Sequence, residues 1–262
     1  MILPKTSRIW ILTIAGVFFI ASDILVNFYH PPALLWVMIG ISFGSILVSR
    51  RYLPEIFLLS RYSFVVNFIL LFLRFPLLET WPMFLLMRLI GLTLLALGFR
   101  DLKRSSGVRS GTTKPVLWAG SAFVVVVSTA ALALWFEYFS DKILLQQWTN
   151  QLPTGNLALI ILAGFGFAIV NAIIEEFIWR GALWRSLAPI FSPVAIIILQ
   201  ALSFGAIHFE GIPSGVPGVV LAFIYGLMLG IIRHKSNGLL LPVIAHFFAD
   251  LCIYGYLVFW LA

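Results

Sequence analysis

The chain has 262 residues, of which 61% are hydrophobic and only 10% are charged. Soluble domains carry about 25% charged residues, so this composition excludes an ordinary soluble globular domain. Long apolar stretches recur from Ile9 to Leu261 and do not alternate with polar residues as barrel strands do. In lipid, a helix satisfies its own backbone hydrogen bonds. We therefore predict an all-α, polytopic transmembrane helix bundle.

The formal charge of +7 could indicate a nucleic-acid partner, but the positions of the basic residues indicate a membrane instead. The breaks rich in Lys and Arg lie at 50–51, 100–114, 180–185 and 233–235, and they alternate with poor ones at 30–32, 140–154 and 209–217. This asymmetry sets membrane topology and needs no nucleic acid. We expect a multi-pass protein of a bacterial inner (plasma) membrane, with the bilayer as a partner and the N-terminus cytoplasmic.

The apolar runs predict eight or nine membrane-spanning helices, at approximately 9–29, 33–49, 62–78, 81–99, 116–138, 156–187, 190–208, 217–233 and 238–261. The first span, 9–29, follows two basic residues, as the core of a signal peptide does. Its apolar pattern continues past Asp23, however, which indicates a membrane anchor. Charged residues and prolines interrupt the region of the third and fourth predicted spans, 62–78 and 81–99. The polar linker 100–114 separates an N-terminal bundle of unknown role (1–115) from a C-terminal bundle (116–262) whose motifs lie within 171–250.

Six ionisable side chains lie in three clusters within the apolar runs of the last third of the chain. They are Glu175, Glu176 and Arg180, then His208, then His246 and Asp250. A charged residue at the centre of a membrane helix costs about 2.5–3.5 kcal/mol on insertion scales. Such residues are therefore rare and usually mark a functional site.

A row of small residues predicts which way the first cluster faces. Gly164, Ala168 and Ala172 recur every four residues, and the same row continues into Glu176 and Arg180. Residues four apart share one helix face, and small ones let a neighbouring helix approach. We expect Glu176 and Arg180 to form an ion pair inside the bundle.

The positions of Glu175, His246 and Asp250 are also informative. Glu175 is rotated about 100° from Glu176 around the axis and has no cation nearby in sequence. His246 and Asp250 are four residues apart, so the carboxylate can orient the imidazole. Gly226 and Gly230 form a GxxxG pattern that favours close helix packing. Each cluster alone fits a structural role, such as an ion pair or a core histidine, but three of them favour one functional site.

The ordered motifs EExxxR, FxxxH and HxxxD resemble those of the CPBP (Abi or CAAX-protease) family of intramembrane proteases. This family includes the eukaryotic enzymes that trim prenylated CAAX proteins. The resembling stretch is roughly 156–252. The resemblance implies that Glu175 activates the attacking water together with His208. It also implies that His246 and the residue at 250 stabilise the oxyanion.

By the same resemblance, Glu176 and Arg180 hold the site in shape. One position departs from the family, which often carries asparagine where this chain has Asp250. An asparagine amide can donate a hydrogen bond to an oxyanion, whereas an ionised carboxylate cannot. Asp250 is therefore either protonated or serves to position His246.

The sequence thus predicts an intramembrane endopeptidase that hydrolyses a peptide bond of a membrane-associated polypeptide without a cofactor. The polypeptide could be a lipidated C-terminus, a sorting signal or a bacteriocin-like peptide. A zinc protease with Glu175, His208 and His246 as ligands is the close rival, although HExxH is absent. Cys252 is the only cysteine, which excludes a multi-thiolate zinc site. The same clusters would also fit a transporter or proton relay, or a non-enzymatic immunity or scaffold protein that tolerates alanine at Glu175 and His208.

Overall fold

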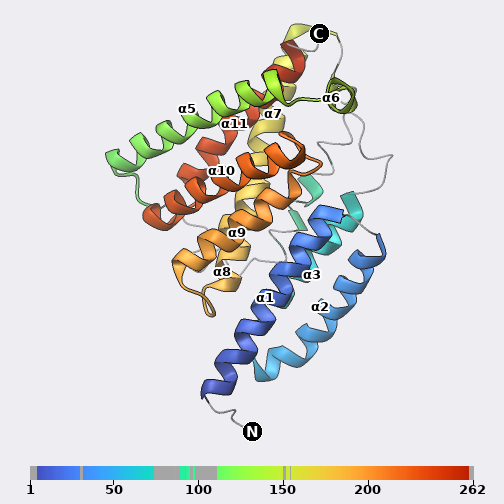
Figure 1. Ribbon diagram of the computed structural model, residues 1–262, viewed down its shortest axis with the longest axis vertical. Coiled ribbons are helices and arrows are strands. Elements are labelled where there is room, and N and C mark those ends of the chain that lie inside the picture. The colour runs from blue at the N-terminus through green and yellow to red at the C-terminus, as the bar shows by residue number, and fades with distance from the viewer. Residues whose placement is uncertain are drawn as a thin grey trace.

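A computed structural model describes residues 5–29, 32–73, 111–149, 152–153 and 155–259, with isolated residues between 86 and 97. In these residues every regular element is a helix, which confirms the all-α prediction. The N-terminal helices are α1 (Lys5–Tyr29), α2 (Pro32–Tyr52) and α3 (Pro54–Leu73). Figure 1 shows them together at the N-terminal end of the elongated molecule.

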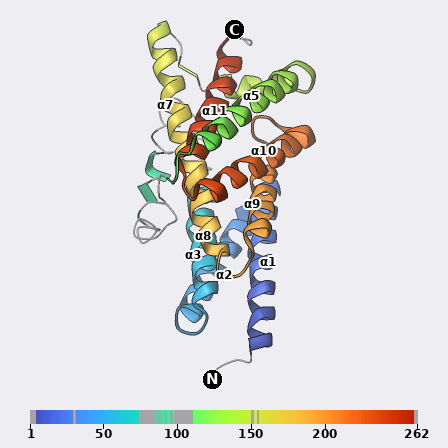
Figure 2. The same cartoon turned by 90° about the vertical axis from the view of Figure 1, so that its left-hand side faces the viewer.

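The C-terminal helices make up the second half of the molecule (Figures 1 and 2). They are α5 (Pro115–Tyr138), α6 (Lys142–Thr149), α7 (Leu157–Glu176), the π-helix η4 (Phe177–Leu183), α8 (Trp184–Leu187), α9 (Pro193–Ile207), α10 (Gly215–Ser236) and α11 (Leu240–Phe259). The elements α7, η4 and α8 follow one another without a break, as the predicted span 156–187 requires.

Within the described residues, five helices are long and apolar enough to cross a membrane. They comprise Ala33–Arg51, Pro115–Tyr138, Leu157–Leu187, Gly215–Ser236 and Leu240–Val258, and the shorter stretches Ile9–Ser22 and Pro193–Ile207 are also apolar. The chain is therefore an integral membrane protein, and the predicted eight or nine spans are compatible with these helices. The cytoplasmic N-terminus stays a prediction.

The predicted spans that differ most from the structure lie around residues 54–99. The span predicted at 62–78 is observed as α3, which begins earlier, at Pro54. Proline favours the first helical position because its fixed backbone suits a helix start and it lacks the N–H that would be unpaired there. The span predicted at 81–99 and most of the linker 100–114 fall largely outside the described residues.

Local signals determine where two of the helices that build the site begin. The Asn156 side chain caps α7 by accepting a hydrogen bond from the Leu159 N–H at 2.9 Å. Ser192 caps α9 in the same way and is followed by Pro193 at the first helical position. These caps satisfy backbone donors that have no partner within the helix.

The small-residue row packs against neighbouring helices as expected. Ala168 and Ala172 are fully buried. A side-chain carbon placed on Gly164 would lie 2.6 Å from the ring of Tyr254 on α11. On α10, the same addition at Gly226 would lie 3.1 Å from the Ala201 Cα of α9. Glycine is therefore what allows α7 to approach α11, and α10 to approach α9.

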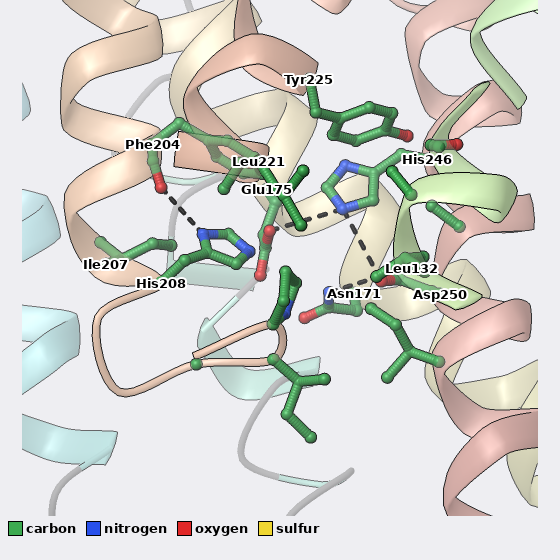
Figure 3. A pocket seen from close by; sticks show the side chains of 18 of the residues that line it. Leu132, Asn171, Glu175, Phe204, Ile207, His208, Leu221, Tyr225, His246 and Asp250 are labelled. Atoms are coloured by element: carbon green, nitrogen blue, oxygen red, sulfur yellow. Dashed lines mark hydrogen bonds and ion pairs between the residues drawn. The ribbon is translucent and has the colours of Figure 1, made fainter. Parts of the chain in front are cut away.

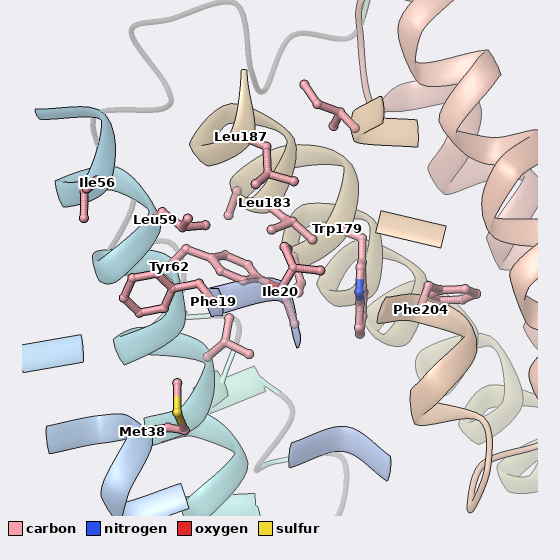
Figure 4. Close-up of a cluster of buried hydrophobic side chains, with 14 of the residues drawn as sticks. Phe19, Ile20, Met38, Ile56, Leu59, Tyr62, Trp179, Leu183, Leu187 and Phe204 are labelled. Atoms are coloured by element: carbon pink, nitrogen blue, oxygen red, sulfur yellow. The ribbon is translucent and has the colours of Figure 1, made fainter. Parts of the chain in front are cut away.

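The N-terminal helices pack against the elements that follow the glutamate pair. Figure 4 shows Phe19 of α1 and Tyr62 of α3 in one apolar cluster with Trp179, Leu183 and Leu187 of η4 and α8. The hydroxyl of Ser186 on α8 also donates to the Leu58 carbonyl of α3 at 3.2 Å. This apolar cluster therefore packs against η4 and α8 and stabilises the continuation of the helix that carries Glu175.

Candidate active site

A pocket of about 410 Å³ lies between α5, α7, α10, α11 and the loop that follows α9 (Figure 3). Its lining is mainly apolar and contains all four residues predicted to act in catalysis: Glu175, His208, His246 and Asp250. Ligand sites are commonly apolar pockets of about 300–1,000 Å³ with a few polar groups. The structure therefore brings together residues from three separate parts of the sequence in one cavity.

Glu175 lies in the last turn of α7, and its side chain is 17% exposed. It is therefore less buried than the other two carboxylates of the site, Glu176 and Asp250. Figure 3 shows its carboxylate between the rings of His208 and His246. Its Oε2 atom is 3.5 Å from the Nε2 atom of His246. The sequence offered no local cation for Glu175, and the structure supplies an imidazole from α11 instead.

His208 directly follows the end of α9 at Ile207. Its Nδ1 atom is 2.9 Å from the backbone carbonyl oxygen of Phe204. A carbonyl can only accept a hydrogen bond, so Nδ1 carries the proton. In a neutral imidazole the other ring nitrogen is then an acceptor, and in Figure 3 it lies on the side of Glu175.

His246 is held by the glutamate that faces the bundle interior. Its Nδ1 atom is 2.7 Å from Glu176 Oε1, and the same oxygen is 2.9 Å from Arg180 Nη1. Glu176 and Arg180 are both fully buried, so the predicted ion pair is confirmed. Because the carboxylate accepts, His246 donates through Nδ1 and turns Nε2 toward the pocket.

Asp250 lies farther from the His246 imidazole than its spacing of four residues suggested. Its Oδ1 atom is 3.7 Å from His246 Nε2, which is too long for a hydrogen bond. We expected Asp250 to orient the ring, but the shorter contact comes from Glu176 on the neighbouring helix. The packing of α7 against α11 creates this contact between residues 70 positions apart.

Three further residues in this region were not predicted as site residues. Asn171 lines the pocket and donates from Nδ2 to Asp250 Oδ2 at 3.1 Å. Tyr225 lines it from α10, with its ring 5.7 Å from that of His246 in an edge arrangement. A signal for Asn171 was present, since a polar residue four positions before Glu175 on an apolar helix shares its face.

Phe204 is the third, and it contacts both imidazoles. Its ring lies 4.7 Å from that of His208 and 5.9 Å from that of His246. The Arg180 guanidinium lies 4.6 Å from the centre of the Phe204 ring. This aromatic residue therefore packs against the buried cation and both histidines at once, which helps to fix their spacing.

The π-helix η4 begins immediately after Glu176, and π-helical turns frequently occur at functional sites. It brings Arg180 to the interface with α10, where Nη2 donates to the Gly226 carbonyl at 3.3 Å. The Arg180 carbonyl in turn accepts from Arg233 Nε at 3.0 Å. The buried guanidinium is thereby held between α7 and α10.

A protein zinc site needs three or four donors at about 2.0–2.3 Å from one point. Among the described residues, no group of three or more His, Cys, Asp and Glu side chains is arranged to hold a metal ion. The zinc alternative with Glu175, His208 and His246 as ligands stays a prediction, which chelation tests.

The fold and pocket define a polytopic membrane protein with an acid–histidine site inside its helix bundle. Residues 156–252 match the family of type II CAAX prenyl endopeptidases described as Rce1-like. The resemblance inferred from the motifs is thereby confirmed over the same stretch. This family indicates a protease and supports intramembrane proteolysis, which implies a polypeptide substrate in the membrane. No curated protein and no solved structure matches the chain.

Proposed function

We propose that this chain is an intramembrane endopeptidase that cleaves a membrane-associated polypeptide with a water molecule held between Glu175 and His208. The observation that carries the proposal is the position of the Glu175 carboxylate between two imidazoles in one pocket. Both imidazoles have Nδ1 engaged by protein oxygens, at Phe204 and Glu176, so both present Nε2 to the pocket.

The two groups can orient the water for attack. The Nε2 lone pair of His208 accepts one O–H of the water, and the Glu175 carboxylate accepts the other. A lone pair of the water oxygen is then free to face the peptide carbonyl carbon. As the new C–O bond forms, Glu175 takes the proton, which is general base catalysis.

His246 is placed to stabilise the negative oxygen that develops. Its Nδ1–H is donated to Glu176, and a neutral imidazole has only one N–H. His246 therefore acts as an imidazolium and donates to the oxyanion through Nε2. Loss of an oxyanion donor typically costs about 10²–10³ in rate. When the C–N bond breaks, the proton on Glu175 passes to the leaving amine.

Glu176 and Arg180 act through His246 and contact no reacting atom in this scheme. Glu176 Oε1 accepts from both the imidazole and the guanidinium, which fixes the ring that faces the substrate. Arg180 neutralises the charge of Glu176 at a position that is buried from water. These two are positioning residues, and their replacement should lower both activity and stability.

The test compares purified wild-type protein with Glu175→Gln in liposomes, with an internally quenched farnesylated CAAX peptide as the probe. Glutamine keeps the shape but cannot take a proton, so we expect a rate loss of at least about 10³-fold. Glu137→Gln, at an exposed position on α5, is the matched control and should keep the wild-type rate. Equal rates for wild type and Glu175→Gln would overturn the proposal.

Mass-spectrometric labelling of new termini in membranes that contain either form extends this comparison to further polypeptides. We expect termini that appear with the wild type and not with Glu175→Gln. Chelation separates the metal-free scheme from a zinc mechanism. If Glu175, His208 and His246 bind zinc, removing the metal should abolish cleavage and added zinc should restore it, whereas the proposed scheme predicts no change.

A further inference from the structure

An amide and a carboxylate from two different helices form a hydrogen-bonded pair on the wall of the pocket. Asn171 lies on α7, one turn before Glu175, and its Nδ2 atom is 3.1 Å from Oδ2 of Asp250 on α11. Their exposed fractions are only 5% and 3%. Figure 3 shows the pair beside His246, on the side of the pocket away from His208.

The chemistry of the two groups fixes the direction of this hydrogen bond. An amide nitrogen can only donate, so Asp250 Oδ2 accepts and is not a donor at this contact. A hydrogen bond to a charged acceptor is roughly twice as strong as one between neutral groups. A carboxylate in an apolar helix bundle is costly unless it is hydrogen-bonded in this way. Asn171 therefore contributes directly to the orientation of the Asp250 carboxylate.

The second oxygen of Asp250 faces the imidazole. Oδ1 lies 3.7 Å from His246 Nε2, the nitrogen that points into the pocket. At this separation it attracts the Nε2–H without binding it, so the proton stays available to a substrate oxygen. Glu176 holds the opposite nitrogen at 2.7 Å. The ring is thus held at Nδ1 by Glu176, and its Nε2 faces two carboxylates: Glu175 Oε2 at 3.5 Å and Asp250 Oδ1 at 3.7 Å, the second of which is oriented by Asn171.

We propose that Asn171 is a positioning residue of the active site: it holds the Asp250 carboxylate in the orientation that keeps His246 aimed at the substrate carbonyl. This inference rests on the proposed function of the same site. In this role Asp250 accepts the hydrogen bond from Asn171 and thereby positions His246. The side chains at 171 and 250 must then complement each other. One must be an amide and the other a carboxylate, whichever helix carries which.

Exchange of the two groups tests this requirement. Asn171→Asp alone places two carboxylates in contact, and like charges at this distance resist joint ionisation. Nearby charged and titratable groups are Glu175 and Glu176 on α7, Arg180 on η4, His208 after α9, Tyr225 on α10 and His246 on α11. The double variant Asn171→Asp with Asp250→Asn restores one amide and one carboxylate, with the hydrogen bond donated in reverse.

The experiment measures kcat and KM on the farnesylated CAAX peptide in liposomes, from acidic to neutral pH. Asn171→Leu should lower kcat by about 10²-fold, the typical effect of misplacing a catalytic group by about 1 Å, and leave KM nearly unchanged. Asn171→Asp should lose activity at neutral pH and recover part of it in acid. The double exchange should restore most of the neutral-pH rate.

Asn67→Leu on α3 is the matched control, because Asn67 is also a buried amide (1% exposed) with a hydrogen bond to Ser63. It should change stability and leave kcat unaltered. Asn171→Ser provides a smaller polar substitution if the leucine variant fails to fold, and its kcat should also fall.

Three results would overturn the inference. Folded Asn171→Leu or Asn171→Ser with the wild-type kcat would remove the role of Asn171 and leave the proposed function intact. A folded double exchange no more active than Asn171→Asp would do the same. A wild-type protein with no Glu175-dependent cleavage would overturn the proposed function and this inference together.

Discussion

Glu176→Gln should destabilise the protein far more than Glu175→Gln, although the two residues are neighbours. Glu176 is fully buried and its Oε1 accepts from Arg180 Nη1 at 2.9 Å and from His246 Nδ1 at 2.7 Å. Glutamine at 176 leaves the buried guanidinium without its counter-charge. Removing one partner of a buried ion pair costs about 3–5 kcal/mol. Glu175 is partly exposed and pairs with no Arg or Lys side chain among the described residues.

The assay is reversible unfolding in mixed micelles with increasing denaturing detergent, followed by circular dichroism. We expect Glu176→Gln to lose about 3–5 kcal/mol of unfolding free energy, and Glu175→Gln to stay within about 1 kcal/mol of the wild type. Adding Arg180→Met to Glu176→Gln should recover part of the loss, because the unpaired charge is then gone. Equal stabilities of the two single variants would refute this reasoning about the ion pair.

Two further predictions use the same unfolding assay. Gly226→Leu should cost at least about 1–3 kcal/mol because its side chain would collide with the Ala201 backbone of α9, whereas Gly120→Leu, with open space around it, should have little effect; similar losses in both would contradict the close packing. Trp179→Phe should cost at least about 0.5–1.5 kcal/mol, because it removes the 3.1 Å hydrogen bond from Nε1 to Ser203 and also part of a buried ring. An unchanged stability would show that neither contributes.

Features that depend on local spacing were predictable from the sequence. The helix predicted at 116–138 is observed as α5 at Pro115–Tyr138, since a long apolar run between polar residues leaves little freedom in its limits. The ion pair of Glu176 and Arg180 follows from a spacing of four residues on one helix. Burial of Ala168 and Ala172 follows from the same spacing.

Contacts between helices could not be predicted in the same way. Three carboxylates were candidates to hold His246, and the sequence favoured Asp250 because it is on the same helix. The choice of Glu176 depends on how α7 and α11 cross in three dimensions, a crossing in which Gly164 packs closely against Tyr254. The π-helix η4 has no simple sequence signal either, since its residues are mostly apolar like those of the α-helix before it.

The water between Glu175 and His208 is proposed to attack the peptide carbonyl itself. Single-turnover cleavage of the farnesylated CAAX peptide in ¹⁸O-labelled water, with the protein in excess, tests this most directly. Mass spectrometry of the first product should find one ¹⁸O atom in the new carboxyl group and no label in the protein. A first product without ¹⁸O, accompanied by label on Glu175, would show that the carboxylate attacks as a nucleophile and would contradict the mechanism.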